Sequence, residues 1–150
     1  MEMVRFLILL ILCLSRLGAA EFSLTIGNPI AANVPRMKTA ALAVRLENCS
    51  DFAKATLSAT AEGLVAGVRR SVSLQTVAGA TPGVYAFAQS WPFDGKWVVN
   101  LKATCGSSAA GTIVPFRGTG FLRESLKSFP RFATAAEVDG SLSELSGGKK

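Results

Sequence analysis

The sequence contains no histidine among its 150 residues. Histidine is the usual general base near neutral pH and the commonest metal ligand. Its absence excludes Ser-His-Asp and Cys-His catalytic units and any histidine-based zinc site. Carboxylates could still act as acid and base, but Glu47, Asp51, Glu62 and Asp94 stand singly beside predicted turns or strand ends. We therefore expect a non-enzymatic protein, with a carboxylate-based enzyme as the weaker alternative.

Phosphate-binding and dinucleotide-binding motifs are also missing, since no glycine-rich loop follows a predicted strand and opens a helix. We expect no cofactor. The chain is basic, with 16 Lys and Arg against 10 Asp and Glu, but its cations are scattered and only Arg69-Arg70 and Lys149-Lys150 are adjacent. A nucleic-acid surface would need clustered cations with interleaved aromatics. We therefore expect no nucleic-acid partner.

No apolar run is long enough to span a membrane. Phe6–Leu14 is unbroken but well short of the roughly 20 residues that a spanning helix needs. It follows the positive Arg5, and the small residues Gly18 and Ala20 stand where a signal peptidase reads them. These features predict a signal peptide at residues 1–20 and an exported protein, periplasmic or extracellular; an uncleaved membrane anchor is the alternative.

Cysteine is scarce, and the predicted cleavage leaves only Cys49 and Cys105. An even count in an oxidising compartment predicts a disulfide. Closing a loop of about 55 residues would stabilise the fold by about 4 kcal/mol. Two free thiols, or a thiolate metal site with Met37 as a further ligand, are the alternatives; we expect no metal. A lipoprotein would use Cys13, but Leu12 stands where a small residue is expected.

Short alternating segments separated by turn residues predict an all-β fold. Their period of two places apolar side chains such as Leu42, Val44 and Leu46 on one face of a strand. We predict an immunoglobulin-like antiparallel β-sandwich of about seven strands at residues 21–116. Ala53–Val65 could instead form a short helix. The predicted strands are Phe22–Ile26, Thr39–Glu47, Ala55–Ala61, Val68–Val77, Val84–Trp91, Lys96–Thr104 and Gly111–Phe116.

The segment Gly83–Cys105 is predicted to form a hairpin, because Asp94-Gly95 is a strong hairpin-turn signal. Within it, one face of Lys96–Thr104 should be buried and the other wet. Tyr85 is expected in the core. Trp97 is expected in the core too, against the Cys49–Cys105 bridge, as in immunoglobulin domains.

Trp91 and Phe93 occupy the predicted hairpin tip. Exposed aromatics there either cap the sandwich or contact a partner, so these two are the candidate partner contacts.

The chain changes character after Phe116, and residues 117–150 are predicted to form a strap or a flexible, disordered tail. Phe121–Phe132 carries apolar and basic residues, so it could dock on a membrane, although a packing strap is the favoured interpretation. Thr134–Lys150 is small, polar and rich in glycine, which favours disorder.

Gly83-Val-Tyr85, the Asp-Gly turn and Gly95-Lys-Trp97-Val-Val-Asn-Leu resemble a segment of bacterial periplasmic immunoglobulin-like modules, the YtkA-like and FixH-like group. The resemblance implies an exported accessory or binding module, sometimes linked to copper handling. Copper handling cannot be carried over, because neither a histidine nor a methionine cluster is present. We predict an exported accessory or interaction module with a protein partner. A small-ligand or metal carrier using the Trp91–Gly95 end is the alternative.

Overall fold

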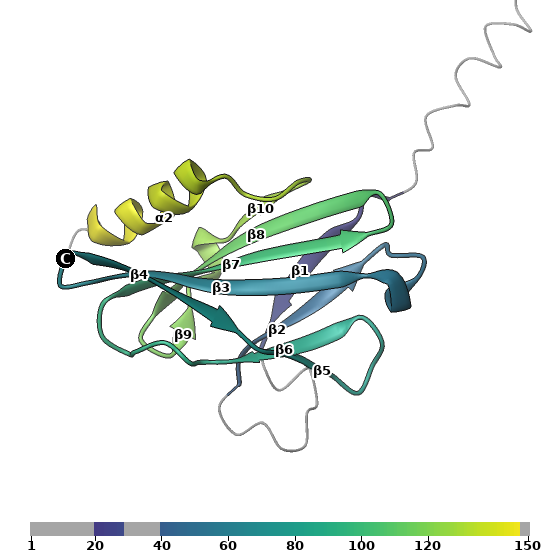
Figure 1. Ribbon diagram of the computed structural model, residues 1–150, viewed down its shortest axis with the longest axis horizontal. Helices are drawn as coiled ribbons and strands as arrows, with labels where there is room; N and C mark the ends of the chain where they lie inside the picture. The colour runs from purple at the N-terminus through teal and green to yellow at the C-terminus, as the bar shows by residue number, and fades with distance from the viewer. Residues whose placement is uncertain (1–19, 29–39, 148–150) are drawn as a thin grey trace, which may run out of the picture.

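A computed structural model describes residues 20–28 and 40–147. Apart from Ala20, the predicted signal peptide lies outside the described residues. This part of the chain forms two antiparallel sheets packed face to face, with one α-helix near its C-terminal end (Figure 1). The strands are β1 (Ser23–Gly27), β2 (Ala40–Glu47), β3 (Thr56–Val65), β4 (Val68–Leu74), β5 (Thr76–Ala78), β6 (Val84–Ala88), β7 (Lys96–Cys105), β8 (Ser108–Arg117), β9 (Gly120–Phe121) and β10 (Lys127–Phe129).

The strand order confirms the predicted immunoglobulin-like sandwich. The first sheet, sheet A, has the order β1-β2-β6-β5, and the second, sheet B, has the order β10-β8-β7-β3-β4 with β9 paired to β8. In immunoglobulin notation these are strands A-B-E-D facing strands G-F-C and C′. The short strands β9 and β10 are additions to that arrangement.

The core lies between the sheets, where the period of two places apolar side chains. On β2, Leu42, Val44 and Leu46 are buried while Arg45 is exposed, as predicted. On β3, Ala59 and Ala61 are buried between more exposed hydroxyl residues. The alternative of a helix across Ala53–Val65 is therefore wrong: the only helical turn there is the 3-10 turn Phe52–Lys54.

Two predicted connections differ from the structure. Strands β6 and β7 belong to different sheets, so Gly83–Cys105 is not a hairpin. Phe87 on β6 and Trp97 on β7 both point into the core, and the strands therefore face each other across it. The predicted strand Val68–Val77 likewise divides after Leu74 into β4 in sheet B and β5 in sheet A.

The predicted disorder after Thr134 is wrong as far as Gly147, because helix α2 (Ala135–Gly147) follows it. Thr134 Oγ1 accepts a hydrogen bond from the Glu137 backbone N–H (3.2 Å), and a Glu137 carboxylate oxygen accepts one from the Thr134 N–H (2.7 Å). This reciprocal pair is a capping box. It satisfies backbone donors that the first helical turn would otherwise leave unpaired.

Helix α2 covers the outer face of sheet B (Figure 1). Its Val138 and Leu142 pack on Val98 and Ile113 in a small core separate from the main one. The face of β7 predicted to be exposed to solvent is therefore buried at Val98 and Asn100. Three ion pairs hold the helix and the chain before it: Arg69–Asp139, Lys127–Glu144 and Arg131–Glu137.

Candidate functional site

The predicted disulfide between Cys49 and Cys105 is present, with a Cα–Cα distance of 5.8 Å. Cys49 follows β2 of sheet A and Cys105 ends β7 of sheet B. The bridge therefore joins the two sheets at one end of the sandwich.

Trp97 lies at the other end of β7, so its predicted packing against the bridge is wrong. Their separation along the strand is about 26 Å at the usual rise per residue. The indole instead covers Gly63 of β3, where a Cβ would lie 2.4 Å from the ring. Trp97 is 2% exposed, and its Nε1 donates a hydrogen bond to the Asp94 carbonyl oxygen (2.8 Å). Tyr85 is half-buried against the main core.

The connection between β6 and β7 carries the candidate partner contacts, and residues 91–95 are here called the Phe93 loop. Trp91 is only 4% exposed and packs edge-on against Phe116, with ring centroids 5.0 Å apart. It is part of the core, so its assignment as a partner contact is wrong. Phe93 is 67% exposed and remains available.

The backbone of the Phe93 loop is tightly constrained. Gly95 has a φ of 81°, and a Cβ at this position would lie 2.6 Å from the Leu64 carbonyl oxygen. A side chain is therefore excluded by conformation and by space. With Trp91 buried on one side and Trp97 bonded to Asp94 on the other, the loop presents Phe93 in a defined position.

A groove of about 460 Å³ adjoins the Phe93 loop. It lies between the β3–β4 turn, Gly95 and the C-terminal end of α2, and Figure 1 shows that turn and the helix end close together. Val68, which follows the turn, is 56% exposed. The residues lining the groove are Leu64, Ala66, Gly67, Gly95, Lys96 and Ser146.

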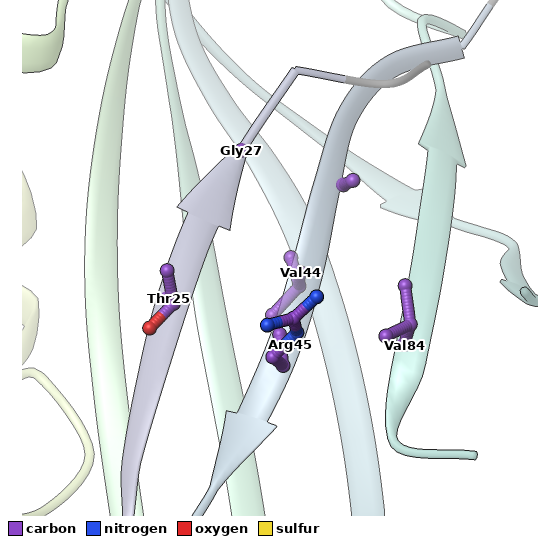
Figure 2. Close-up of a pocket in the computed structure, with 6 residues that line it drawn as sticks. Thr25, Gly27, Val44, Arg45 and Val84 are labelled. Atoms are coloured by element: carbon purple, nitrogen blue, oxygen red, sulfur yellow. The ribbon is translucent and has the colours of Figure 1, made fainter. Parts of the chain in front are cut away.

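A second hollow, of about 200 Å³, lies on sheet A beside β1, β2 and β6 (Figure 2). Thr25, Arg45 and Val84 project from three neighbouring strands, and Gly27 borders the hollow. Arg45 is its one charged lining residue among those described. The described residues that line this hollow supply one positive charge from Arg45, one hydroxyl group from Thr25 and otherwise apolar side chains, with no carboxylate among them.

Two of the acidic residues considered for catalysis, Asp51 and Glu62, make hydrogen bonds within the structure. Asp51 accepts a hydrogen bond from the Ala53 N–H, and Glu62 accepts one from Ser71 (3.1 Å). The described residues contain no group of three or more Cys, Asp or Glu that could hold a metal ion. None of the helices in residues 20–28 and 40–147 is long and apolar enough to span a membrane.

The segment Phe121–Phe132 is a strap on sheet B, composed of β9, the 3-10 turn Arg123–Ser125 and β10. Phe121 packs near Phe116, and Phe129 packs against the small core under α2. Phe132 is 40% exposed, with the Lys102 ammonium 5.8 Å from its ring centroid.

Comparisons of the chain with protein-family models, with curated proteins and with solved structures found no significant match. The site therefore has to be interpreted from its own geometry. Sequence reasoning identified Phe93 but missed the groove beside it. The groove is formed by Gly95, the β3–β4 turn and Ser146 of α2, three segments far apart in the chain.

Proposed function

We propose that this protein is an exported, non-enzymatic interaction module of the periplasm or the extracellular space, and that a protein partner contacts its Phe93 loop. The observation that carries the proposal is the exposure of Phe93 at 67% on a loop fixed between two buried tryptophans. Aromatic side chains dominate the binding energy of many interfaces. A loop that is ordered before binding loses little further entropy when it binds.

The disulfide supports the proposed compartment, because such bonds persist in oxidising environments. The burial of Trp91 counts against the alternative of a ligand carrier, since it removes one of the two aromatic side chains of the Trp91–Gly95 end. A membrane contact through Phe121–Phe132 is also less favoured, because that segment is engaged as a strap.

The test compares Phe93→Ser with Phe132→Ser, a matched change at the other exposed phenylalanine of the described residues. Phe93→Ser should unfold within about 0.5 kcal/mol of the wild type, as substitutions at exposed positions usually do. Phe132→Ser should cost about 1 kcal/mol, because it also removes the contact with Lys102. Cross-linking in the native compartment should give a partner retained by the wild type and Phe132→Ser and lost with Phe93→Ser. If Phe93→Ser retains the same cross-linked partners as the wild type, the Phe93 loop is not the contact.

A further inference from the structure

The groove beside the Phe93 loop combines the charge of Lys96, which is unpaired among the described residues, with an apolar wall formed by Leu64 and Ala66. We propose that it receives an extended, acidic segment of the partner protein. This inference rests on the proposed function, because Gly95 is both part of the Phe93 loop and a wall of the groove.

Of the two cations beside the groove, Arg69 is paired with acidic side chains of the described residues and Lys96 is not. The strand register places Lys96, Leu64 and Arg69 side by side across β7, β3 and β4. Arg69 already bonds Asp139 (2.7 Å) and Glu62 (3.5 Å). Lys96 has no ion pair with any residue in the described part of the chain. Its ammonium group is therefore available to a carboxylate from outside.

Exposed apolar side chains are concentrated at the same end of the sandwich. Of the large hydrophobic residues that are exposed in the described ranges, Phe93 and Val68 are the most accessible, at 67% and 56%. A Cβ at Gly95 would lie 2.6 Å from the Leu64 carbonyl oxygen and 2.9 Å from a Val65 methyl group, and Val65 pairs with Val68. Val65 and Val68 lie on the face of sheet B opposite to Lys96, whereas Leu64 lies beside Lys96 on the same face and lines the groove. A bound segment that places an acidic side chain on Lys96 can therefore place an apolar one on Leu64.

The shape of the groove favours a polypeptide segment over a lipid surface. A bilayer is broad and cannot enter a hollow between a turn and a helix end, whereas an extended chain can. Two of the lining residues are glycines, and a Cβ at Gly67 would meet nothing within 4 Å. A backbone can therefore approach closely there, and the volume of about 460 Å³ lies within the range of known ligand pockets.

The experiment uses the exported, oxidised protein and three fluorescent decapeptides with identical alternating leucines. The intervening residues are Glu in the first peptide, Gln in the second and Lys in the third. The Glu peptide should bind most tightly and the Lys peptide least tightly, and NMR shifts on binding of the Glu peptide should centre on Gly67, Gly95 and Lys96. Lys96→Gln should weaken binding about two- to fivefold, as expected for one partly exposed ion pair. The matched control is Lys54→Gln, which removes an exposed cation from the 3-10 turn after β2 and should leave binding unchanged.

Each result has a distinct consequence. If Phe93→Ser abolishes cross-linking but Lys96→Gln binds the Glu peptide as the wild type does, the acidic segment is wrong and the proposed function stands. If Phe93→Ser keeps its cross-linked partner, the proposed function fails. Equal binding of the Glu and Gln peptides, or phosphatidylglycerol vesicles shifting the same resonances while the Glu peptide does not, also overturns the inference. The inference is also overturned if Lys96→Gln lowers the stability of helix α2 but leaves peptide binding unchanged. Lys96 would then serve only to offset the negative partial charge at the C-terminus of the helix.

Discussion

Replacing Gly63 by alanine should destabilise the protein strongly, although it adds a single methyl group. The new Cβ would lie 2.4 Å from Trp97 ring atoms, far inside van der Waals contact. The ring is 2% exposed and bonded to the Asp94 carbonyl oxygen, so it cannot move outward without losing packing and a hydrogen bond. Overpacking costs about 1–3 kcal/mol and the lost hydrogen bond about 1 kcal/mol. We therefore expect the free energy of unfolding to fall by about 2–4 kcal/mol.

The assay is urea denaturation followed by tryptophan fluorescence, which reports on the two buried tryptophans, Trp91 and the displaced Trp97. Gly27→Ala is the matched control, because Gly27 also lies in a strand and a Cβ there meets nothing within 4 Å. Its stability should be unchanged or slightly raised, since alanine restricts the unfolded chain. If Gly63→Ala unfolds at the same urea concentration as Gly27→Ala, the described packing of Trp97 on β3 is incorrect.

Three further predictions concern the bridge, the helix and the core. Reducing the bridge, or making Cys49→Ser, should lower the free energy of unfolding by about 4 kcal/mol in urea titrations, because the loop it closes is long; an unchanged midpoint would contradict this. The Arg131 side chain and the Thr134 N–H lower the pKa of Glu137 from 4.5 to about 2, so its stabilisation of α2 is complete above about pH 4.5 and is lost as the pH falls toward 2. Hydrogen exchange of α2 should show this loss, and Glu137→Gln should remove it; the same pH dependence in the variant would argue against the capping box. Trp91→Ala should cost about 3–5 kcal/mol in chemical denaturation, as deletion of a buried aromatic does, and a cost below 1 kcal/mol would return Trp91 to the surface.

Much of the fold could be predicted because strand faces are encoded locally. The alternation around Leu42 and Val44 identified the buried side of β2 without knowledge of its neighbours. Sheet membership is not encoded in this way. The alternation from Val68 to Val77 continues through the point where the chain passes from β4 to β5, so it predicts one strand where there are two. Asp94-Gly95 predicts a turn equally well whether the next strand pairs or crosses to the other sheet.

In the candidate site, too, only the features that depend on neighbouring residues in the sequence could be predicted. The capping box of α2 could have been recognised from Thr134-Ala-Ala-Glu137 before an apolar residue, which is a local signal. The burial of Trp91 could not, because it depends on Phe116 from a distant strand. The groove depends on the approach of Gly95 in the Phe93 loop to Leu64 and Val65 at the end of β3, and no local pattern encodes that approach.

The position of the disulfide affects how the two sheets can move. They are joined covalently at the Cys49–Cys105 end, while the Trp97 end is held by non-covalent contacts. Separation of the sheets during thermal fluctuations should therefore be smallest near the bridge and increase along β7 toward Lys96. A partner bound beside the Phe93 loop would contact the molecule where this breathing is greatest. Binding there should slow hydrogen exchange along β3 and β7 well beyond Leu64 and Lys96, the residues of these strands that line the groove.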